Sequence, residues 1–181
     1  IASAKGVIKT YKGIPLYLSD DSPCTLQILQ NRATQVKAKC GTLDLVIVDY
    51  LQMIAMPSAY KSENRTRDIG VISRGLKDIA REYKCPVIAL SSLSRAVEQR
   101  QDKRPMMSDL RESGDIESDA DVIQFIYRSA YYDRKQDGEE DYGIDKAEII
   151  TAKNRNGRTG VSLLDFEPRY AKFTEFDLLG L

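Results

Sequence analysis

The first half of the chain contains two segments in which apolar residues recur every three or four positions. This spacing predicts amphipathic helices, because it places the apolar side chains on one helical face. The first helix is expected after a capping Thr25, with the apolar face Leu26, Leu29, Ala33, Val36 and Cys40. The second is expected from about Ser62 to Tyr83, with the apolar face Ile69, Ile72, Leu76, Ile79 and Tyr83. Gly70 and Gly75 weaken the second helix by on the order of 1 kcal/mol each relative to alanine.

Three short apolar runs alternate with these helices and predict strands. Ile14–Ser19 and Pro86–Ser91 flank a central run, Leu45–Val48, which has four apolar residues in succession. Such a run fits a strand that is buried on both faces of a parallel sheet. The order strand, helix, strand, helix, strand implies right-handed parallel crossovers.

The second half of the chain has a different pattern. A long polar loop follows Ser92, with a short helix near Ser108–Arg111, and then a strand is expected at Val122–Tyr127. Later short runs are joined by turn residues typical of antiparallel hairpins. These runs are 146–153, 159–166 and 170–173. The sequence therefore predicts an α/β fold, a mainly parallel sheet flanked by helices and extended by antiparallel strands at the C-terminal end, within one domain over residues 1–181.

The central apolar run ends at a carboxylate, Asp49. The carboxyl end of a parallel strand borders the crevice where open α/β sheets bind ligands. Asp49 would there face the phosphates of a nucleotide and hold Mg²⁺, directly or through water. The alternative is an ordinary buried strand that ends in a turn-forming aspartate, and this run alone leaves both interpretations open.

Composition narrows the possible classes of site. Lys plus Arg and Asp plus Glu both number 27, so any contact with nucleic acid must be local. Three cysteines and no histidine argue against a zinc site and favour reduced thiols in a cytosolic protein. No apolar stretch is long enough to span a bilayer, so no membrane contact is expected. The sequence also has no Gly-Lys phosphate loop, which we expect to lie upstream of Ile1 in an N-terminally truncated chain.

Several polar blocks occur together in one order along the chain. They are Asp49–Gln52, Asn64–Thr66, Arg95–Arg100, Lys103–Pro105, Ser108–Gly114, Ile116–Asp121 and Lys153–Gly157. With these blocks the chain resembles the C-terminal motor domain of DnaB-type replicative DNA helicases over nearly its whole length. The resemblance implies a RecA-like ATPase that uses ATP and Mg²⁺ and works as a homohexamer around single-stranded DNA. It also implies a primase, a helicase loader and a cytoplasmic location, in the bacterial nucleoid or a phage-infected cell.

The resemblance assigns roles to individual residues. Asp49 matches the Mg²⁺-associated aspartate, and Arg111, Glu112 and Gly114 match a DNA-contacting loop in the central channel. The alternative for that loop is a helix cap followed by a salt-bridged surface turn.

Lys153 and Arg155 match a trans-acting lysine and an arginine finger. Because they lie two apart, they would project from one face of an extended strand into a neighbouring subunit's nucleotide site. The alternative is a basic hairpin tip exposed to water, which is compatible with the finger role.

One position departs from the family pattern. Ser92 stands where the family usually has a glutamine that senses the γ-phosphate, and a hydroxyl reaches less far than an amide. The family's catalytic glutamate and phosphate-binding lysine are expected before Ile1, so this chain alone should not hydrolyse ATP. The leading hypothesis is an ATP-driven 5′-to-3′ DNA-unwinding motor. The alternatives are another RecA-class repair or recombination ATPase and a non-enzymatic, helicase-derived interaction module.

Overall fold

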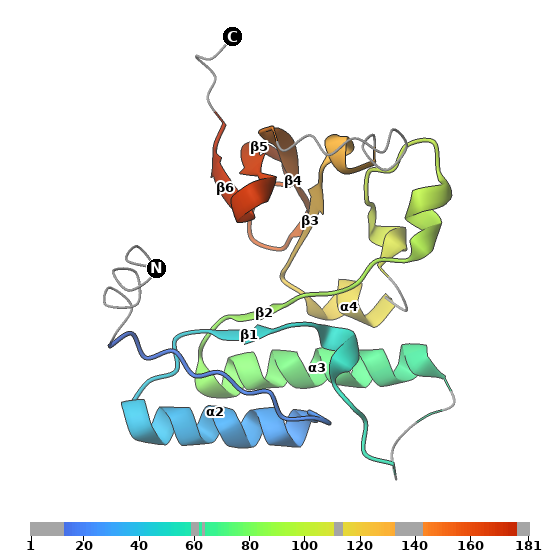
Figure 1. The fold of residues 1–181 in the computed structure, drawn as a ribbon. Helices are drawn as coiled ribbons and strands as arrows, with labels where there is room; N and C mark the ends of the chain where they lie inside the picture. The colour runs from blue at the N-terminus through green and yellow to red at the C-terminus, as the bar shows by residue number, and fades with distance from the viewer. Residues whose placement is uncertain (1–12, 59–61, 63, 111–113, 133–142, 177–181) are drawn as a thin grey trace.

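The computed structural model describes residues 13–58, 62, 64–110, 114–132 and 143–176, and it consists of two sheets and three labelled α-helices (Figure 1). The helices are α2 (Leu26–Cys40), α3 (Arg65–Tyr83) and α4 (Gly114–Asp119). The strands are β1 (Val46–Val48), β2 (Val87–Ala89), β3 (Val122–Tyr127), β4 (Asp145–Asn154), β5 (Gly160–Glu167) and β6 (Lys172–Glu175). None of the helices in these ranges is long and apolar enough to cross a membrane.

The N-terminal part consists of two layers, a two-stranded parallel sheet and two helices. β1 pairs with β2 in the register Val46↔Val87 to Val48↔Ala89. Figure 1 shows α2 and α3 side by side against one face of this sheet. The predicted order of strand, helix and parallel strand is therefore confirmed from β1 through α3 to β2.

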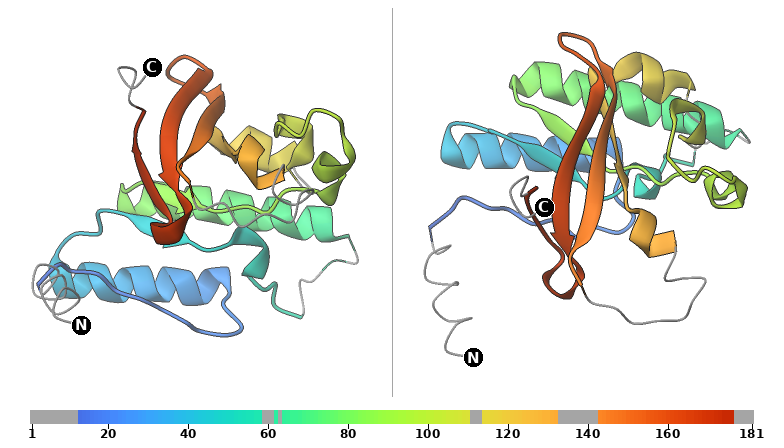
Figure 2. Two further views of the ribbon diagram at one scale, coloured as in Figure 1. Left: turned by 45° about the horizontal axis from the view of Figure 1, so that its top comes forward. Right: turned by 90° about the horizontal axis from the view of Figure 1, so that it is seen from above.

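The C-terminal part forms a separate antiparallel sheet in the order β3-β4-β5-β6. The hairpins predicted from the turn residues are all present, and the views in Figure 2 show this sheet on the side of β1 and β2 that faces away from α2. In the described residues the parallel part has two strands and the antiparallel part has four.

Both predicted helices are present. The predicted core face of α2 is confirmed only in part, because Ala33 is buried whereas Cys40, at the end of this face, is exposed. Thr25 caps α2, since its side-chain oxygen accepts a hydrogen bond from the Ile28 N–H at 3.3 Å. Helix α3 begins at Arg65 rather than near Ser62, because Asn64 supplies the cap and accepts from the Thr66 N–H at 3.0 Å. All five residues of the predicted α3 core face are buried.

The two glycines of α3 allow other helices to approach closely. A Cβ at Gly70 would lie 1.9 Å from an Asp115 carboxylate oxygen on α4, and a Cβ at Gly75 would lie 2.5 Å from the Leu26 Cδ1 on α2. The sequence pattern indicates only their intrinsic cost to the helix. The structure shows that both positions are packing contacts.

The strand predicted at Ile14–Ser19 is wrong. No strand among the described residues pairs with this segment, and its side chains are exposed, Leu18 to 88%. An apolar run becomes a strand only when a neighbouring strand satisfies its N–H and C=O groups. Its backbone makes a local hydrogen bond, from the Leu16 N–H to the Ile14 carbonyl at 2.8 Å.

The expectation that the central strand is buried on both faces is also wrong for this chain. Helices cover one face of the parallel sheet, whereas Ile47 on β1 is 60% exposed and Ile88 on β2 is 51% exposed. The continuous apolar run fits two covered faces, but the described residues supply a cover for only one.

A second local difference lies after Ser92. The short helix predicted near Ser108–Arg111 is a 3-10 turn over Met107–Asp109, and the α-helix of this region, α4, begins later, at Gly114. The sequence does not predict α4, because one buried residue, Ile116, is too few to produce an apolar period.

Candidate functional site

Asp49 lies at the carboxyl end of β1, as the sequence predicts. It directly follows Val48, and its side chain is exposed. The adjoining segments are tied together by the backbone, since the Leu90 N–H donates to the Val48 carbonyl at 2.9 Å and the Leu51 N–H donates to the Leu90 carbonyl at 2.8 Å. The peptide bond from Asp49 to Tyr50 is cis. The two backbone hydrogen bonds place the Asp49 carboxylate at the edge where the parallel strands end.

Gln52 links the ends of the two parallel strands, a role that the sequence analysis does not assign. Its side-chain NH₂ donates to the Ser91 hydroxyl at 2.9 Å, and its side-chain oxygen accepts from the Ser92 N–H at 3.2 Å. Its backbone carbonyl accepts from Arg65 on α3 at 2.6 Å. Ser92 thus lies beside a glutamine amide, although it is not itself a glutamine. The sequence signal for this role of Gln52 is that it is a polar residue three positions after Asp49.

The chemistry of this edge is compatible with Mg²⁺. Mg²⁺ commonly keeps several waters and binds one or two carboxylates together with substrate phosphates. An exposed carboxylate at a strand end meets that requirement. No group of three or more candidate metal ligands exists among the described residues, so Asp49 would act without a preformed protein cage.

The structure brings Lys153 and Arg155 together at one end of α4. The Lys153 ammonium donates to the Glu117 carbonyl, and the Arg155 guanidinium donates to the Ser118 carbonyl at 3.0 Å. Lys153 belongs to β4, but Arg155 lies in the turn after Asn154, so the two do not share an extended strand as predicted. They nevertheless converge, because they reach consecutive carbonyls near the helix end.

Asp121 is the carboxylate at this helix end. It pairs with Arg155 at 3.2 Å and with Lys77 of α3, and its backbone carbonyl accepts from the Arg155 N–H at 2.8 Å. The hydrogen bond from Lys77 lowers the pKa of Asp121 below its ordinary value. Burial opposes this shift, and the charges of Lys77, Arg155 and Lys153 add to it.

The predicted DNA-contacting loop is described in part. Arg111 and Glu112 lie outside the described residues, whereas Gly114 is the exposed first residue of α4. The segment before the loop is fixed, since Asp109 binds the Arg100 guanidinium at 2.7 Å and accepts from the Met106 N–H at 2.8 Å. This pair lies before the loop itself, so it leaves both the surface-turn alternative and a DNA contact by the following residues open.

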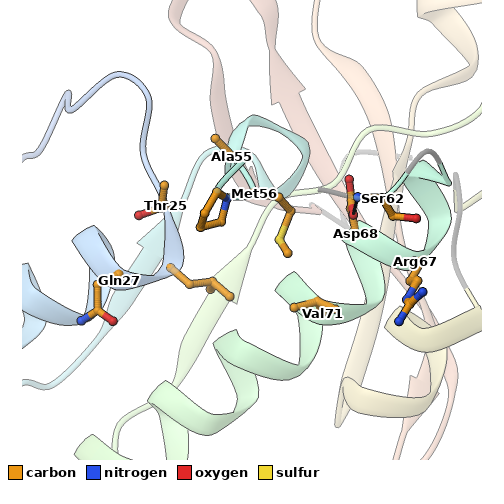
Figure 3. A pocket seen from close by; sticks show the side chains of 10 residues that line it. Thr25, Gln27, Ala55, Met56, Ser62, Arg67, Asp68 and Val71 are labelled. Atoms are coloured by element: carbon orange, nitrogen blue, oxygen red, sulfur yellow. Dashed lines mark hydrogen bonds between the residues drawn. The ribbon is translucent and has the colours of Figure 1, made fainter. Parts of the chain in front are cut away.

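A hollow of about 600 Å³ lies elsewhere on the molecule, between α2, α3 and the segment after η1 (Leu51–Met53). Figure 3 shows that Met56 and Val71 contribute apolar surface and that the Asp68 carboxylate lies beside Ser62. Asp68 accepts from the Ser62 N–H at 3.0 Å. None of the predicted site residues lines this hollow, so it is separate from the strand-end site.

Comparison with known protein families agrees with this arrangement. The family model described as the DnaB-like helicase C-terminal domain matches residues 2–175. The chain belongs to this family. The match includes every predicted site residue from Asp49 to Arg155.

Two of the relatives that the chain matches are named replicative DNA helicases. The chain is 46% identical over 173 residues to the replicative DNA helicase DnaB of Haemophilus influenzae, covering 96% of this chain and 35% of that protein. It is 48% identical over 152 residues to the replicative DNA helicase DnaC of Bacillus subtilis, covering 81% of this chain and 32% of that protein. The chain spans about a third of the length of these relatives.

Two solved structures have the same fold as this chain. One, described as an ATPase domain, superposes with a TM-score of 0.85 at 40% identity, covering 97% of this chain and 60% of that one. The other, a DnaB-like replicative helicase described with its interactions with primase, superposes with a TM-score of 0.81 at 41% identity, covering 97% and 41%. These similarities confirm the predicted RecA-like α/β fold class.

Proposed function

We propose that this chain is the motor portion of an ATP-driven replicative DNA helicase that translocates on single-stranded DNA and unwinds the duplex. One observation carries the proposal. Within a chain that belongs to the DnaB-like family, Asp49 stands exposed at the carboxyl end of a parallel strand, and a hairpin turn presents Arg155 at the surface.

The nucleotide site would combine residues of two subunits. Asp49 would hold Mg²⁺ on the ATP of its own subunit, and Mg²⁺ neutralises negative charge on the phosphates when it is bound. Lys153 and Arg155 would approach the ATP of the neighbouring subunit in a homohexameric ring. The exposure of Arg155, 48% of its side chain, supports this role, because a finger must be able to reach beyond its own subunit.

The segment at the start of α4 would contact the DNA backbone. A Cβ at Gly114 would meet no atom within 4 Å, and Gly114 does not adopt a positive φ. Neither packing nor backbone conformation in the described residues therefore requires glycine at this position. Close approach of a phosphate to a backbone N–H is a reason for glycine here. The Arg111 guanidinium and a backbone N–H of the loop that includes Glu112 would complete this contact without reading bases.

The partners follow from the same proposal. The full-length protein would meet a primase, as the structure of one DnaB-like relative shows for that protein, and a loader that places the ring on DNA. It would act in the cytoplasm, at the bacterial nucleoid or in a phage-infected cell. Ser92, held beside Gln52, would retain only part of the link between nucleotide and DNA binding.

Removal of Arg155 from the full-length protein tests this proposal. Arg155→Ala should lower ATP turnover by roughly 10³-fold or more, as loss of an arginine finger does. Arg155→Lys should recover little activity, because a point charge cannot reproduce the planar donor pair.

The control is Arg158→Ala, which removes a cation three residues further along the chain. Circular dichroism should show an intact fold in all three variants. Normal turnover of Arg155→Ala would contradict the finger assignment. Absence of turnover in the wild-type, full-length protein would instead favour the non-enzymatic interaction module.

A further inference from the structure

The end of α4 carries a carboxylate to which neither the sequence analysis nor the proposed function assigns a role. Asp121 joins three separate elements, since it contacts Lys77 of α3, follows α4 and contacts Arg155 in the β4–β5 turn. Its side chain is 51% exposed, whereas the side chain of Lys77 is only 18% exposed. Asp121 therefore has a well-packed cation on one side and an accessible cation on the other.

The Arg155 guanidinium is held at two of its nitrogens. NH1 pairs with the Asp121 carboxylate at 3.2 Å, and NH2 donates to the Ser118 carbonyl at 3.0 Å. The backbone of the turn is fixed separately by the bond from the Arg155 N–H to the Asp121 carbonyl. A change of the Asp121 side chain should thus free the guanidinium while leaving the turn in place.

We propose that Asp121 is the positioning residue of the Arg155 finger and that Lys77 fixes Asp121 for this task. This inference rests on the proposed function, because it requires that Arg155 act on a nucleotide of the neighbouring subunit. With two nitrogens held on its own subunit, the guanidinium keeps one orientation before a phosphate arrives. Such preorganisation avoids the ordering cost of a free, rotamer-rich side chain at the moment of reaction.

The surroundings favour a positioning role over a role in folding. An exposed ion pair contributes little to stability, so the pair with Arg155 is not needed to hold the fold. The pair is also weak enough to break when Arg155 engages a phosphate. Lys153 reaches the Glu117 carbonyl at the same helix end, so both cations of the turn depend on the placement of α4.

The test is Asp121→Asn in the full-length protein. It keeps the shape of the side chain and removes its charge. We expect kcat for ATP hydrolysis to fall roughly 5-fold, the effect of losing an exposed ion pair at the upper end of its usual strength, with little change in KM. Lys77→Met should lower kcat in the same direction by a smaller factor. The matched control is Asp78→Asn, which alters an exposed α3 carboxylate that pairs with Arg81.

Mixed rings separate positioning from a structural effect. When Asp121→Asn protein is mixed with inactive Asp49→Ala protein, some junctions combine an intact Asp49 with an Arg155 that retains its Asp121. Turnover per Asp121→Asn subunit should therefore rise above that of Asp121→Asn alone. Asp121→Glu should restore part of the loss in the unmixed enzyme, since it returns the charge.

Two results would overturn the inference. One is turnover of Asp121→Asn within about 2-fold of wild type. The other is a loss that mixing does not relieve, because a residue acting in its own subunit or through the fold gains nothing from an intact neighbour. An Arg155→Ala protein tested in parallel shows whether a negative result concerns the positioning role of Asp121 or the trans site itself. If that variant is also unrelieved by mixing, the proposed trans site itself is wrong.

Discussion

At the scale of single residues, Arg155 fits both interpretations of its sequence context. It is an exposed cation at a hairpin tip, and it is the residue that the family resemblance marks as a finger. The exposed ion pair between Arg155 and Asp121 is compatible with both interpretations. Surface ion pairs are worth about 0 to 1 kcal/mol, so Arg155 can exchange Asp121 for a phosphate at small cost.

Arg111 provides a test of the DNA-contact assignment. Arg111→Ala in the full-length protein should weaken binding of single-stranded DNA with little dependence on sequence. The salt slope of log affinity should fall by about one unit or slightly less, because one phosphate contact is lost. The measurement is a titration of fluorescent oligonucleotides at several salt concentrations.

Lys103→Ala is a suitable control, because it removes a cation from the preceding part of the same polar segment, where Lys103 lies over the ring of Tyr132. A properly folded Arg111→Ala protein with an unchanged salt slope would remove Arg111 from the DNA-contacting residues.

The positions and contacts of individual residues differ in how far the sequence predicts them. Asp49 is predictable because an apolar run ending in a carboxylate fixes its position at the sheet edge. Gln52 and Asp121 are missed because their partners are distant in sequence. Gln52 binds Ser91 and Ser92 some forty positions away, and Asp121 binds Lys77. Only the fold brings these groups together.

At the scale of elements, local patterns predict helices better than strands in this chain. The buried face of α3 and the buried Ala33 of α2 follow from a spacing that each helix carries within itself. The segment 14–19 has the composition of a strand, but no described strand pairs with it. Burial of β1 likewise depends on what covers its second face. Strands require partners that a local pattern does not contain.

Gly70 offers a quantitative test of how α3 packs on α4. Gly70→Ala places a Cβ 1.9 Å from an Asp115 carboxylate oxygen, so Asp115 or α4 must shift. We expect a net loss of about 1 to 3 kcal/mol in the free energy of unfolding, as overpacking causes, despite alanine's higher helix propensity. Chemical denaturation monitored by circular dichroism measures this change.

The double variant Gly70→Ala/Asp115→Ala tests whether the clash with Asp115 causes the loss of stability. In an Asp115→Ala background the clash is absent, so Gly70→Ala should stabilise the protein by up to about 1 kcal/mol. A destabilisation of the same size in both backgrounds would show that the Gly70–Asp115 contact is not responsible.

At the scale of the whole molecule, the fold brings the two regions with proposed functions to opposite ends of one short helix. α4 begins at Gly114, beside the predicted DNA loop, and its C-terminal carbonyls hold Lys153 and Arg155. Gly70 and Lys77 place this helix against α3. The α/β class and the order of its elements are predictable from the sequence, whereas this arrangement is not, because α4 has no apolar period.

We propose that Arg155 acts on ATP held by the neighbouring subunit, and hydrolysis by mixed rings tests this action. Arg155→Ala and Asp49→Ala proteins should each be inactive alone. A ring containing both has some junctions at which an intact Asp49 faces an intact Arg155. A trans finger therefore predicts partial recovery of ATP hydrolysis on mixing. No recovery, with mixed rings confirmed by native mass spectrometry, would rule out a trans finger and place the action of Arg155 within its own subunit.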